Sequence, residues 1–209
     1  DENGQEDWFQ TFEGKNFNSG YSVQQTTDGG YVITGQMDGV ESGDVYLLKT
    51  DGNGIEEWSQ NFGDSGWDMG TSVQQTYDGG YIITGKTWFF DGNTQDIYLI
   101  KTDGNGEEEW SQTFGGTDFE QGNSVQQTTD GGYIITGYTS SINSDVYLIK
   151  TYGSGEEQWS QTFGGTGQDI GHSVQQTTDG GYIITGSTDS YGNGQEDILI
   201  IKTDENGEE

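Results

Sequence analysis

The stretch Ser124–Gly137, SVQQTTDGGYIITG, decides the fold of this 209-residue chain. Close copies of it begin at Ser22, Ser72 and Ser173. A second phrase, Trp-Ser-Gln-x-Phe and its variants, begins at Trp8, Trp58, Trp110 and Trp159, which are 50, 52 and 49 residues apart. A period near 50 residues is typical of solenoids, propellers and arrays of small units. Because one such unit is too small to bury a core alone, the architecture must come from stacking the four copies.

One repeat predicts four short strands. Trp110–Phe114 alternates large apolar and polar residues, as half-buried strands do, and Ser124–Thr128 is a short second strand. Asp130-Gly-Gly132 predicts a tight turn, because glycine supplies the positive φ that a hairpin requires. Tyr133–Thr136 and Asp145–Ile149 are apolar on both faces, which indicates deep burial. No segment has helical periodicity, and proline, which interrupts strands, is absent.

These motifs resemble the kelch-like and quinoprotein-like propeller repeats that occur in tandem in secreted and cell-surface proteins of bacteria and archaea. The family pattern joins W-x-x-x-(F/Y)-G-G, S-V-x-x-T-x-D-G-G-Y-I-x-x-G-x-T and D-x-Y-L-I-K-T-D-x-x-G, and this chain matches it four times over nearly its whole length. The resemblance implies an all-β fold, a β-propeller with four blades of four antiparallel strands per chain. It also implies an extracellular or cell-surface location.

We expect a single propeller domain over residues 1–209, with repeats at about 8–57, 58–109, 110–158 and 159–209. Residues 1–13 are expected to supply the outer strand of the last blade, which would close the ring and remove its open edges. A closed ring of one chain is the favoured arrangement. Two alternatives remain open: two chains that exchange this strand in an eight-bladed ring, and a piece of a longer array.

Charge excludes several classes of partner. The chain carries 36 acidic residues, six lysines and no arginine, for a net charge of −30. Nucleic acids and anionic membrane surfaces are therefore not expected partners, because both require a basic footprint. No apolar run approaches the ~20 residues that span a bilayer, so membrane insertion is not expected. The absence of cysteine excludes disulfides and a thiol nucleophile.

An aromatic cluster is the first candidate site. Loops on a rigid scaffold commonly carry binding residues, and the expected loop that begins with Lys86 contains three consecutive aromatic residues. With an aromatic residue of a neighbouring loop they predict a platform for a glycan ring or a protein side chain. The alternative is that these rings fold back into the blade. The candidate ligand-binding residues are Trp67, Trp88, Phe89 and Phe90.

Acidic residues at repeated positions form the second candidate site. One set precedes each Ser-Val, where the first repeat has Asn18, and another precedes each strand that ends in Lys-Thr. Carboxylate oxygens suit Ca²⁺, although the EF-hand signature is missing. The alternative is a structural role, in which these side chains accept hydrogen bonds from nearby backbone. The candidate metal ligands are Asp68, Glu120, Asp169, Asp44, Asp96, Asp145 and Asp197.

Catalysis has little support in the sequence. His172 is the only histidine, and it occupies a position that is Tyr21, Thr71 and Asn123 in the other repeats. We therefore predict a non-enzymatic protein that binds a glycan or a protein through one face. In each repeat this face carries the loop between the strands equivalent to Trp110–Phe114 and Ser124–Thr128, and the loop between those equivalent to Tyr133–Thr136 and Asp145–Ile149. The alternative is a structural repeat of a surface layer, sheath or filament, which self-associates. At −30 per chain such an assembly would need cations to screen the repulsion.

Overall fold

The computed structural model describes residues 3–12, 18–38, 43–63, 66–89, 94–140, 143–192 and 195–209. All regular structure in these ranges is β-strand, which confirms the all-β prediction. Within the same ranges there is no helix with the length and apolarity of a membrane span.

The strands fall into four consecutive units, numbered here from the N-terminus. Unit 1 contains β1 (Asn18–Gln25), β2 (Tyr31–Asp38), β3 (Gly43–Thr50) and β4 (Glu56–Phe62). Unit 2 contains β5 (Trp67–Gln75), β6 (Tyr81–Phe89), β7 (Thr94–Thr102) and β8 (Glu108–Phe114). Unit 3 contains β9 (Phe119–Gln127), β10 (Tyr133–Ser140), β11 (Ser144–Thr151) and β12 (Glu157–Phe163). Unit 4 contains β13 (Asp169–Gln176), β14 (Tyr182–Thr188) and β15 (Asp197–Thr203).

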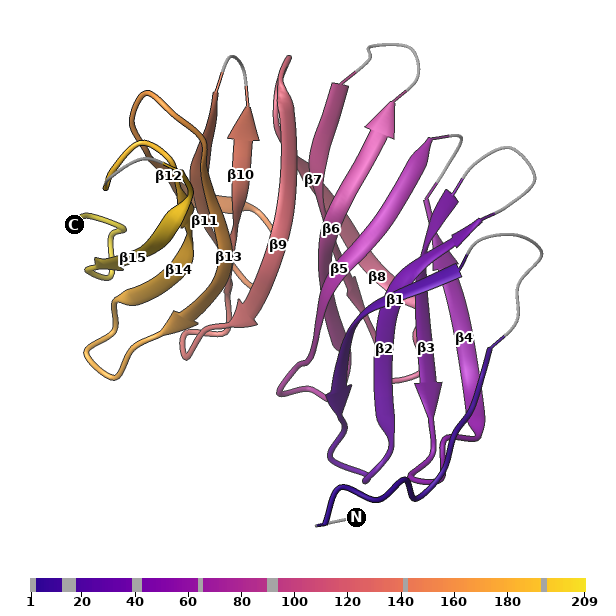
Figure 1. Ribbon diagram of the computed structural model, residues 1–209. Coiled ribbons are helices and arrows are strands. Elements are labelled where there is room, and N and C mark those ends of the chain that lie inside the picture. Colours follow the sequence, from indigo (N-terminus) through magenta and orange to yellow (C-terminus); the bar gives the residue numbers. More distant parts are fainter. Residues whose placement is uncertain are drawn as a thin grey trace.

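Within a unit, each strand pairs antiparallel with the next one along the chain. Single parallel pairings, Gly43 with Trp67 and Gln95 with Phe119, link units 1 and 2 and units 2 and 3 into one twelve-stranded sheet. Unit 4 is a separate three-stranded sheet. Figure 1 shows the units side by side in a curved row, with the N-terminus at the unit 1 end and the C-terminus at the unit 4 end.

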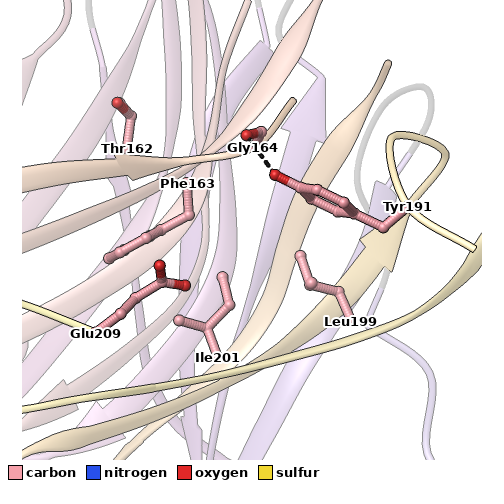
Figure 2. Close-up of a pocket in the computed structure, with 7 residues that line it drawn as sticks. All are labelled: Thr162, Phe163, Gly164, Tyr191, Leu199, Ile201 and Glu209. Atoms are coloured by element: carbon pink, nitrogen blue, oxygen red, sulfur yellow. Dashed lines mark hydrogen bonds between the residues drawn. The ribbon is translucent and has the colours of Figure 1, made fainter. Parts of the chain in front are cut away.

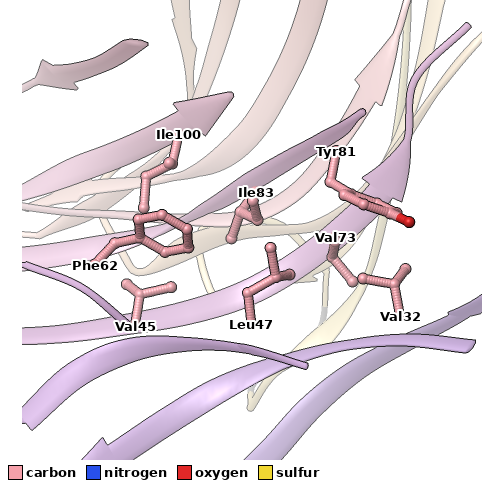
Figure 3. Close-up of a cluster of buried hydrophobic side chains, with 8 residues drawn as sticks. All are labelled: Val32, Val45, Leu47, Phe62, Val73, Tyr81, Ile83 and Ile100. Atoms are coloured by element: carbon pink, nitrogen blue, oxygen red, sulfur yellow. The ribbon is translucent and has the colours of Figure 1, made fainter. Parts of the chain in front are cut away.

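The hydrophobic core lies between units rather than inside them. Figure 3 shows the cluster between units 1 and 2, where Val45 and Leu47 of β3 meet Val73 and Ile83 of the next unit. Equivalent clusters lie between units 2 and 3 and between units 3 and 4. Neighbouring strands of different units therefore bury each other's apolar faces, as the repeat predicted.

Two further contacts recur at each junction. The Trp58 ring of β4 lies 5.7 Å from the Tyr81 ring of unit 2, and the same edge-on pair recurs at the next two junctions with Trp110 and Trp159. The backbone N–H of Gln75 donates to Oε1 of Gln24 at 2.5 Å, and the equivalent bonds at the following junctions are 2.6 Å long. These contacts fix the position of each unit against the next.

A buried lysine closes the hairpins of units 1–3. In unit 2, the Lys101 ammonium donates to the Thr102 carbonyl and contacts Asp78 at 3.0 Å and Glu109 at 2.8 Å, while its side chain is only 4% exposed. A Cβ at Gly80 would lie 2.7 Å from this ammonium and closer still to the Thr102 carbonyl, so only glycine fits there. The second glycine of the Asp-Gly-Gly turn thus makes room for the ion pair.

The expected ring closure is wrong in this structure. Residues 5–12 form no strand, and they lie against unit 1 instead of unit 4. The Trp8 ring lies 5.8 Å from Tyr31, and a Cβ at Gly54 would collide with it, as one at Gly106 would collide with Trp58. Trp8 therefore occupies on unit 1 the place that Trp58 occupies on unit 2. The fourth strand of unit 4 is missing from the described residues.

The ion pairs of Lys101 with Asp78 and Glu109, which we call the lysine clamp, predict how stability depends on pH. Burial alone would raise the pKa of Asp78, but hydrogen bonds from Thr76, Gly80 and Lys101 outweigh it and lower the pKa from 3.8 to about 2. Because the folded-state pKa is depressed, this contribution is present above pH 3.8 and is lost as the pH falls through about 2.

Lys101→Met should therefore lower the free energy of unfolding at pH 7 by about 1–3 kcal/mol, and the deficit should shrink between pH 4 and pH 2. Urea unfolding across this range measures it. Lys202→Met is the matched control, since the Lys202 side chain is 44% exposed and its loss should cost less. A deficit that stays constant down to pH 2 would contradict the role given to Asp78.

Candidate functional site

The two kinds of connection that were expected to form one face do meet at the same end of the units. β2 and β6 end there, where β3, β5, β7 and β9 begin, opposite the Asp-Gly-Gly turns (Figure 1). Residues 13–17, 39–42, 64–65, 90–93, 141–142 and 193–194 lie outside the described residues. We call this end the loop face.

The aromatic cluster is built on strands and not on a loop. β6 continues to Phe89, because Trp88 and Phe89 pair with Gln95 and Thr94 of β7, so the expected loop from Lys86 is wrong in this part. Trp67 opens β5 and lies directly opposite Trp88. Trp67 is 39% exposed and Trp88 is half-buried. Two of the four predicted residues thus form a cross-strand pair at the loop face. The Phe89 side chain and the whole of Phe90 lie outside the described residues.

Sequence reasoning missed one aromatic residue here. Phe119 opens β9 as Trp67 opens β5, and it lies opposite Ser140 with 41% of its surface exposed. The signal was available, because Phe119 precedes Glu120 as Trp67 precedes Asp68.

The predicted acidic residues come together in pairs, one pair at each junction. The parallel pairing of Gly43 with Trp67 places Asp44 beside Asp68, and that of Gln95 with Phe119 places Asp96 beside Glu120. The third pair faces a glycine: a Cβ at Gly164 would lie 2.8 Å from Asp169 Oδ2 and closer still to Asp145 Oδ1. Asp197, in contrast, is exposed on β15 and belongs to no such pair among the described residues.

In two of the three pairs, one carboxylate also accepts hydrogen bonds from nearby residues. Asp169 Oδ2 accepts hydrogen bonds from the Gly165 N–H at 2.9 Å and from the Ser190 hydroxyl at 2.5 Å. Glu120 Oε1 accepts one from the Thr139 hydroxyl at 2.8 Å. These bonds are the structural role that the sequence left open as an alternative to metal binding.

Other oxygens of the same pairs lack a hydrogen-bond donor within the described part of the chain. They are Asp96 Oδ1, Glu120 Oε2, Asp145 Oδ1 and Asp169 Oδ1. Burial raises the pKa of Asp96, of Glu120 and of Asp145, and the neighbouring Asp169 charge adds to the effect on Asp145. Two such carboxylates side by side favour a bound proton or a cation between them. No group of three or more His, Cys, Asp or Glu side chains suited to a metal occurs in the described ranges.

The clearest feature that the sequence did not reveal lies at the two ends of the row. Ile198 and Ile200 of β15 are 84% and 67% exposed, whereas the residues at the same positions of β3, β7 and β11 are at most 1% exposed. At the other end, Val23 of β1 is 65% exposed, whereas its counterparts Val73, Val125 and Val174 are each 6% exposed. Each end thus presents one half of the apolar junction that is complete between all internal neighbours.

A hollow of about 390 Å³ lies beside β15 (Figure 2). Leu199 and Ile201 of β15 and Phe163 of β12 give it an apolar floor, and the Tyr191 hydroxyl, which donates to the Gly164 carbonyl at 2.8 Å, borders it. It lies along the edge of β15 that in units 1–3 is covered by the fourth strand.

The only histidine does not take part in any of these sites. His172 is exposed on β13, and its Nε2 lies 3.3 Å from the Ser187 hydroxyl.

Comparison with known proteins shows similarity of fold only. No protein-family model and no curated protein matches the chain. A protein of unknown function from Dyadobacter fermentans has a TM-score of 0.60 at 13% identity over 89% of this chain. A xylan beta-1,4-xylosidase from Bacillus halodurans has a TM-score of 0.50 at 18% identity over 90%. A tail fiber of Staphylococcus aureus phage P68 has a TM-score of 0.34 at 10% identity over 90%. The chain spans 60%, 42% and 50% of the lengths of these three chains respectively.

Proposed function

We propose that this protein is a non-enzymatic structural repeat protein of the β-propeller type, related to the kelch-like and quinoprotein-like repeats, whose copies join end to end at a cell surface or outside the cell. One observation carries the proposal: the two ends of the row expose complementary halves of a junction that is buried three times inside the chain. The extracellular location rests on the family resemblance, and the cysteine-free, acidic composition is compatible with it.

The apolar faces support the joining of ends. If unit 4 of one copy meets unit 1 of another in the internal geometry, Ile198 and Ile200 pack against Val23, Tyr31 and Ile33. These last three match Val73, Tyr81 and Ile83 of unit 2, which cover β3 in the first core cluster. Each buried Ile or Val contributes roughly 1.5–3 kcal/mol, so covering this face would stabilise a complex appreciably.

The hydrogen bonds at the ends support the same geometry. At the internal junctions, a Ser hydroxyl and a Gln side-chain oxygen of one unit accept backbone N–H groups of the next. In unit 4 the equivalent side chains, Ser173 and Gln175, are exposed, and the backbone N–H groups that would match them belong to Val23 and Gln25. The joint is heterologous, so it closes two copies into a ring of eight units or continues as a filament.

Light scattering on a size-exclusion column tests this proposal at moderate salt, which screens the acidic chains from one another. We expect a mass of at least two 22.8 kDa chains. Ile200→Glu should return the protein to a single-chain mass, because it places a charge in the joint. Tyr77→Glu is the control, since Tyr77 is 76% exposed in the turn between β5 and β6 of unit 2, away from both ends. A single-chain mass for the unsubstituted protein at all concentrations would refute assembly.

A second candidate function is ligand binding at the loop face. The observation that favours it is the cross-strand pair of Trp67 and Trp88, whose exposed member offers an aromatic surface to a glycan ring or a protein side chain. The same row that joins end to end would then display this pair at regular intervals.

Affinity electrophoresis in a panel of soluble polysaccharides measures this second function. Trp67→Ser should lower the affinity for a retained polysaccharide about tenfold, which corresponds to about 1.4 kcal/mol. Phe119→Ser, an equivalent substitution in the next unit, should have a smaller effect because no aromatic residue lies opposite Phe119. Equal affinities for the Trp67 variant and the unsubstituted protein would remove this candidate as a glycan site.

A further inference from the structure

The N-terminal segment differs from the fourth strands of units 1–3 at one position. Residues 8–12, Trp-Phe-Gln-Thr-Phe, differ from all of Trp58–Phe62, Trp110–Phe114 and Trp159–Phe163 only at Phe9, where these strands have a serine. Phe9 is 72% exposed. A large aromatic residue has replaced a small polar one in a segment that pairs with no strand of the described chain.

β15 also differs from its counterparts, at a position that faces the edge where a fourth strand would pair. Leu199 stands where β3, β7 and β11 have Tyr46, Tyr98 and Tyr147. In unit 3 the Tyr147 hydroxyl is hydrogen-bonded to Ser160, so the tyrosine of one strand reaches the serine of the next. The smaller Leu199 leaves the hollow of Figure 2, whose volume of about 390 Å³ far exceeds the roughly 30 Å³ of a water molecule.

We propose that residues 8–12 of a second copy add to the edge of β15 as the missing fourth strand of unit 4, with Phe9 seated in this hollow. The proposal rests on the proposed end-to-end assembly and specifies its joint. In unit 1, Ser59 lies opposite Leu48 and Trp58 opposite Lys49. The same register places Phe9 opposite Ile201 and Trp8 opposite Lys202. Leu199 and Phe9 thus take at the joint the places that Tyr147 and Ser160 take in unit 3.

The placement of Trp8 argues for a second copy rather than closure within one chain. Trp8 is already packed on Tyr31 and Gly54 of its own unit 1, in the geometry that Trp58 adopts on unit 2. Trp58 belongs to a strand that pairs with unit 1 while its ring covers unit 2. A segment that keeps Trp8 on its own unit 1 therefore offers its free edge to the unit that precedes it. At the far end of the row, β15 of another copy has the matching free edge (Figure 1).

Two substitutions and their combination test the joint. Phe9→Ser should weaken association about 100-fold, because the hollow is left unfilled. Leu199→Tyr should weaken it comparably, because the tyrosine competes with Phe9 for the same space. The double variant Phe9→Ser/Leu199→Tyr recreates the internal pair and should restore association to near the original level. Sedimentation equilibrium measures all four proteins. Tyr77→Ser, which removes an aromatic residue 76% exposed in a turn, is the control and should change nothing.

The outcomes separate this joint from the assembly itself. If Ile200→Glu abolishes association while Phe9→Ser leaves it unchanged, assembly stands and the added strand is refuted. If the two single substitutions weaken association and the double variant does not recover, the seating of Phe9 against Leu199 is refuted. The chain has no cysteine, so a chain with Gln10→Cys and a chain with Ile200→Cys can be mixed to check the register. A disulfide within one chain of the variant that carries both would show closure by its own segment and overturn the proposal.

A second inference rests on different atoms, the carboxylate pairs at the junctions. Glu120 is 4% exposed, and its Oε2, like Oδ1 of Asp96, has no donor among the described residues. At the next junction Asp169 is 0% exposed, and its Oδ1 and that of Asp145 lack a donor in the same part of the chain. A Cβ at Gly115 would lie 2.7 Å from Glu120 Oε2 and closer still to Asp96 Oδ1, so the two carboxylates converge on a position without a side chain. We infer that these junctions bind divalent cations of the Ca²⁺ type, which take carboxylate oxygens, with backbone carbonyls and water as further ligands.

Calcium titration calorimetry on protein freed of metal by chelator tests this inference. The background is Ile200→Glu, which keeps the protein in single chains, so that binding is read apart from assembly. We expect saturable binding and the loss of one site in Asp96→Asn/Glu120→Gln. Glu108→Gln/Glu156→Gln changes the net charge equally at exposed positions away from the junctions and should keep every site. No saturable heat, or an equal loss in both double variants, would show a diffuse counterion atmosphere and refute the sites.

Discussion

Each unit of this protein has two apolar faces, and no unit can cover both of them alone. Ile82 and Ile83 are successive residues of β6, so they point to opposite faces of the sheet, and both are buried. Ile83 belongs to the cluster with unit 1 and Ile82 to the cluster with unit 3. Stability therefore depends on neighbours on both sides, and a row of such units necessarily ends in two uncovered faces. The exposed Ile198 and Val23 are the direct result of this constraint.

Much of the fold was predictable because the same turn and strand motifs recur in every repeat. The Asp-Gly-Gly turns and the doubly apolar strands appear four times, and local chemistry is sufficient to place them. Ring closure was not predictable from the sequence. Trp8 packs on Tyr31 of unit 1 as Trp58, Trp110 and Trp159 pack on the equivalent tyrosines of units 2, 3 and 4. Its sequence match to Trp58 shows which kind of strand residues 8–12 resemble, but not which unit they contact. The lysine clamp was also missed, since Lys101 and Asp78 are 23 positions apart and only the hairpin brings them together.

The candidate sites were predictable to different degrees. The acidic positions recur with the repeat, so their selection needed only the sequence, but their pairing across junctions needed the geometry of β3 against β5. The cross-strand partnership of Trp67 and Trp88 depends on the register of β5 and β6, which the unusual aromatic run concealed by suggesting a loop. The end faces were not recognisable at all, because Ile198 and Ile200 occupy positions that read as core in every repeat.

Near-identical repeats carry a danger of mistaken pairing, since any fourth strand of one copy resembles those of all the others. The substitutions at Phe9 and Leu199 give the ends of the row a shape that the interior lacks. An interior strand with its serine would leave the hollow beside Leu199 empty, and Phe9 would collide with an interior tyrosine. Phe9 therefore fits beside Leu199 and not beside an interior tyrosine, which distinguishes an end of the row from an interior unit. Strands that are nearly identical in sequence can in this way be kept from pairing in the wrong place.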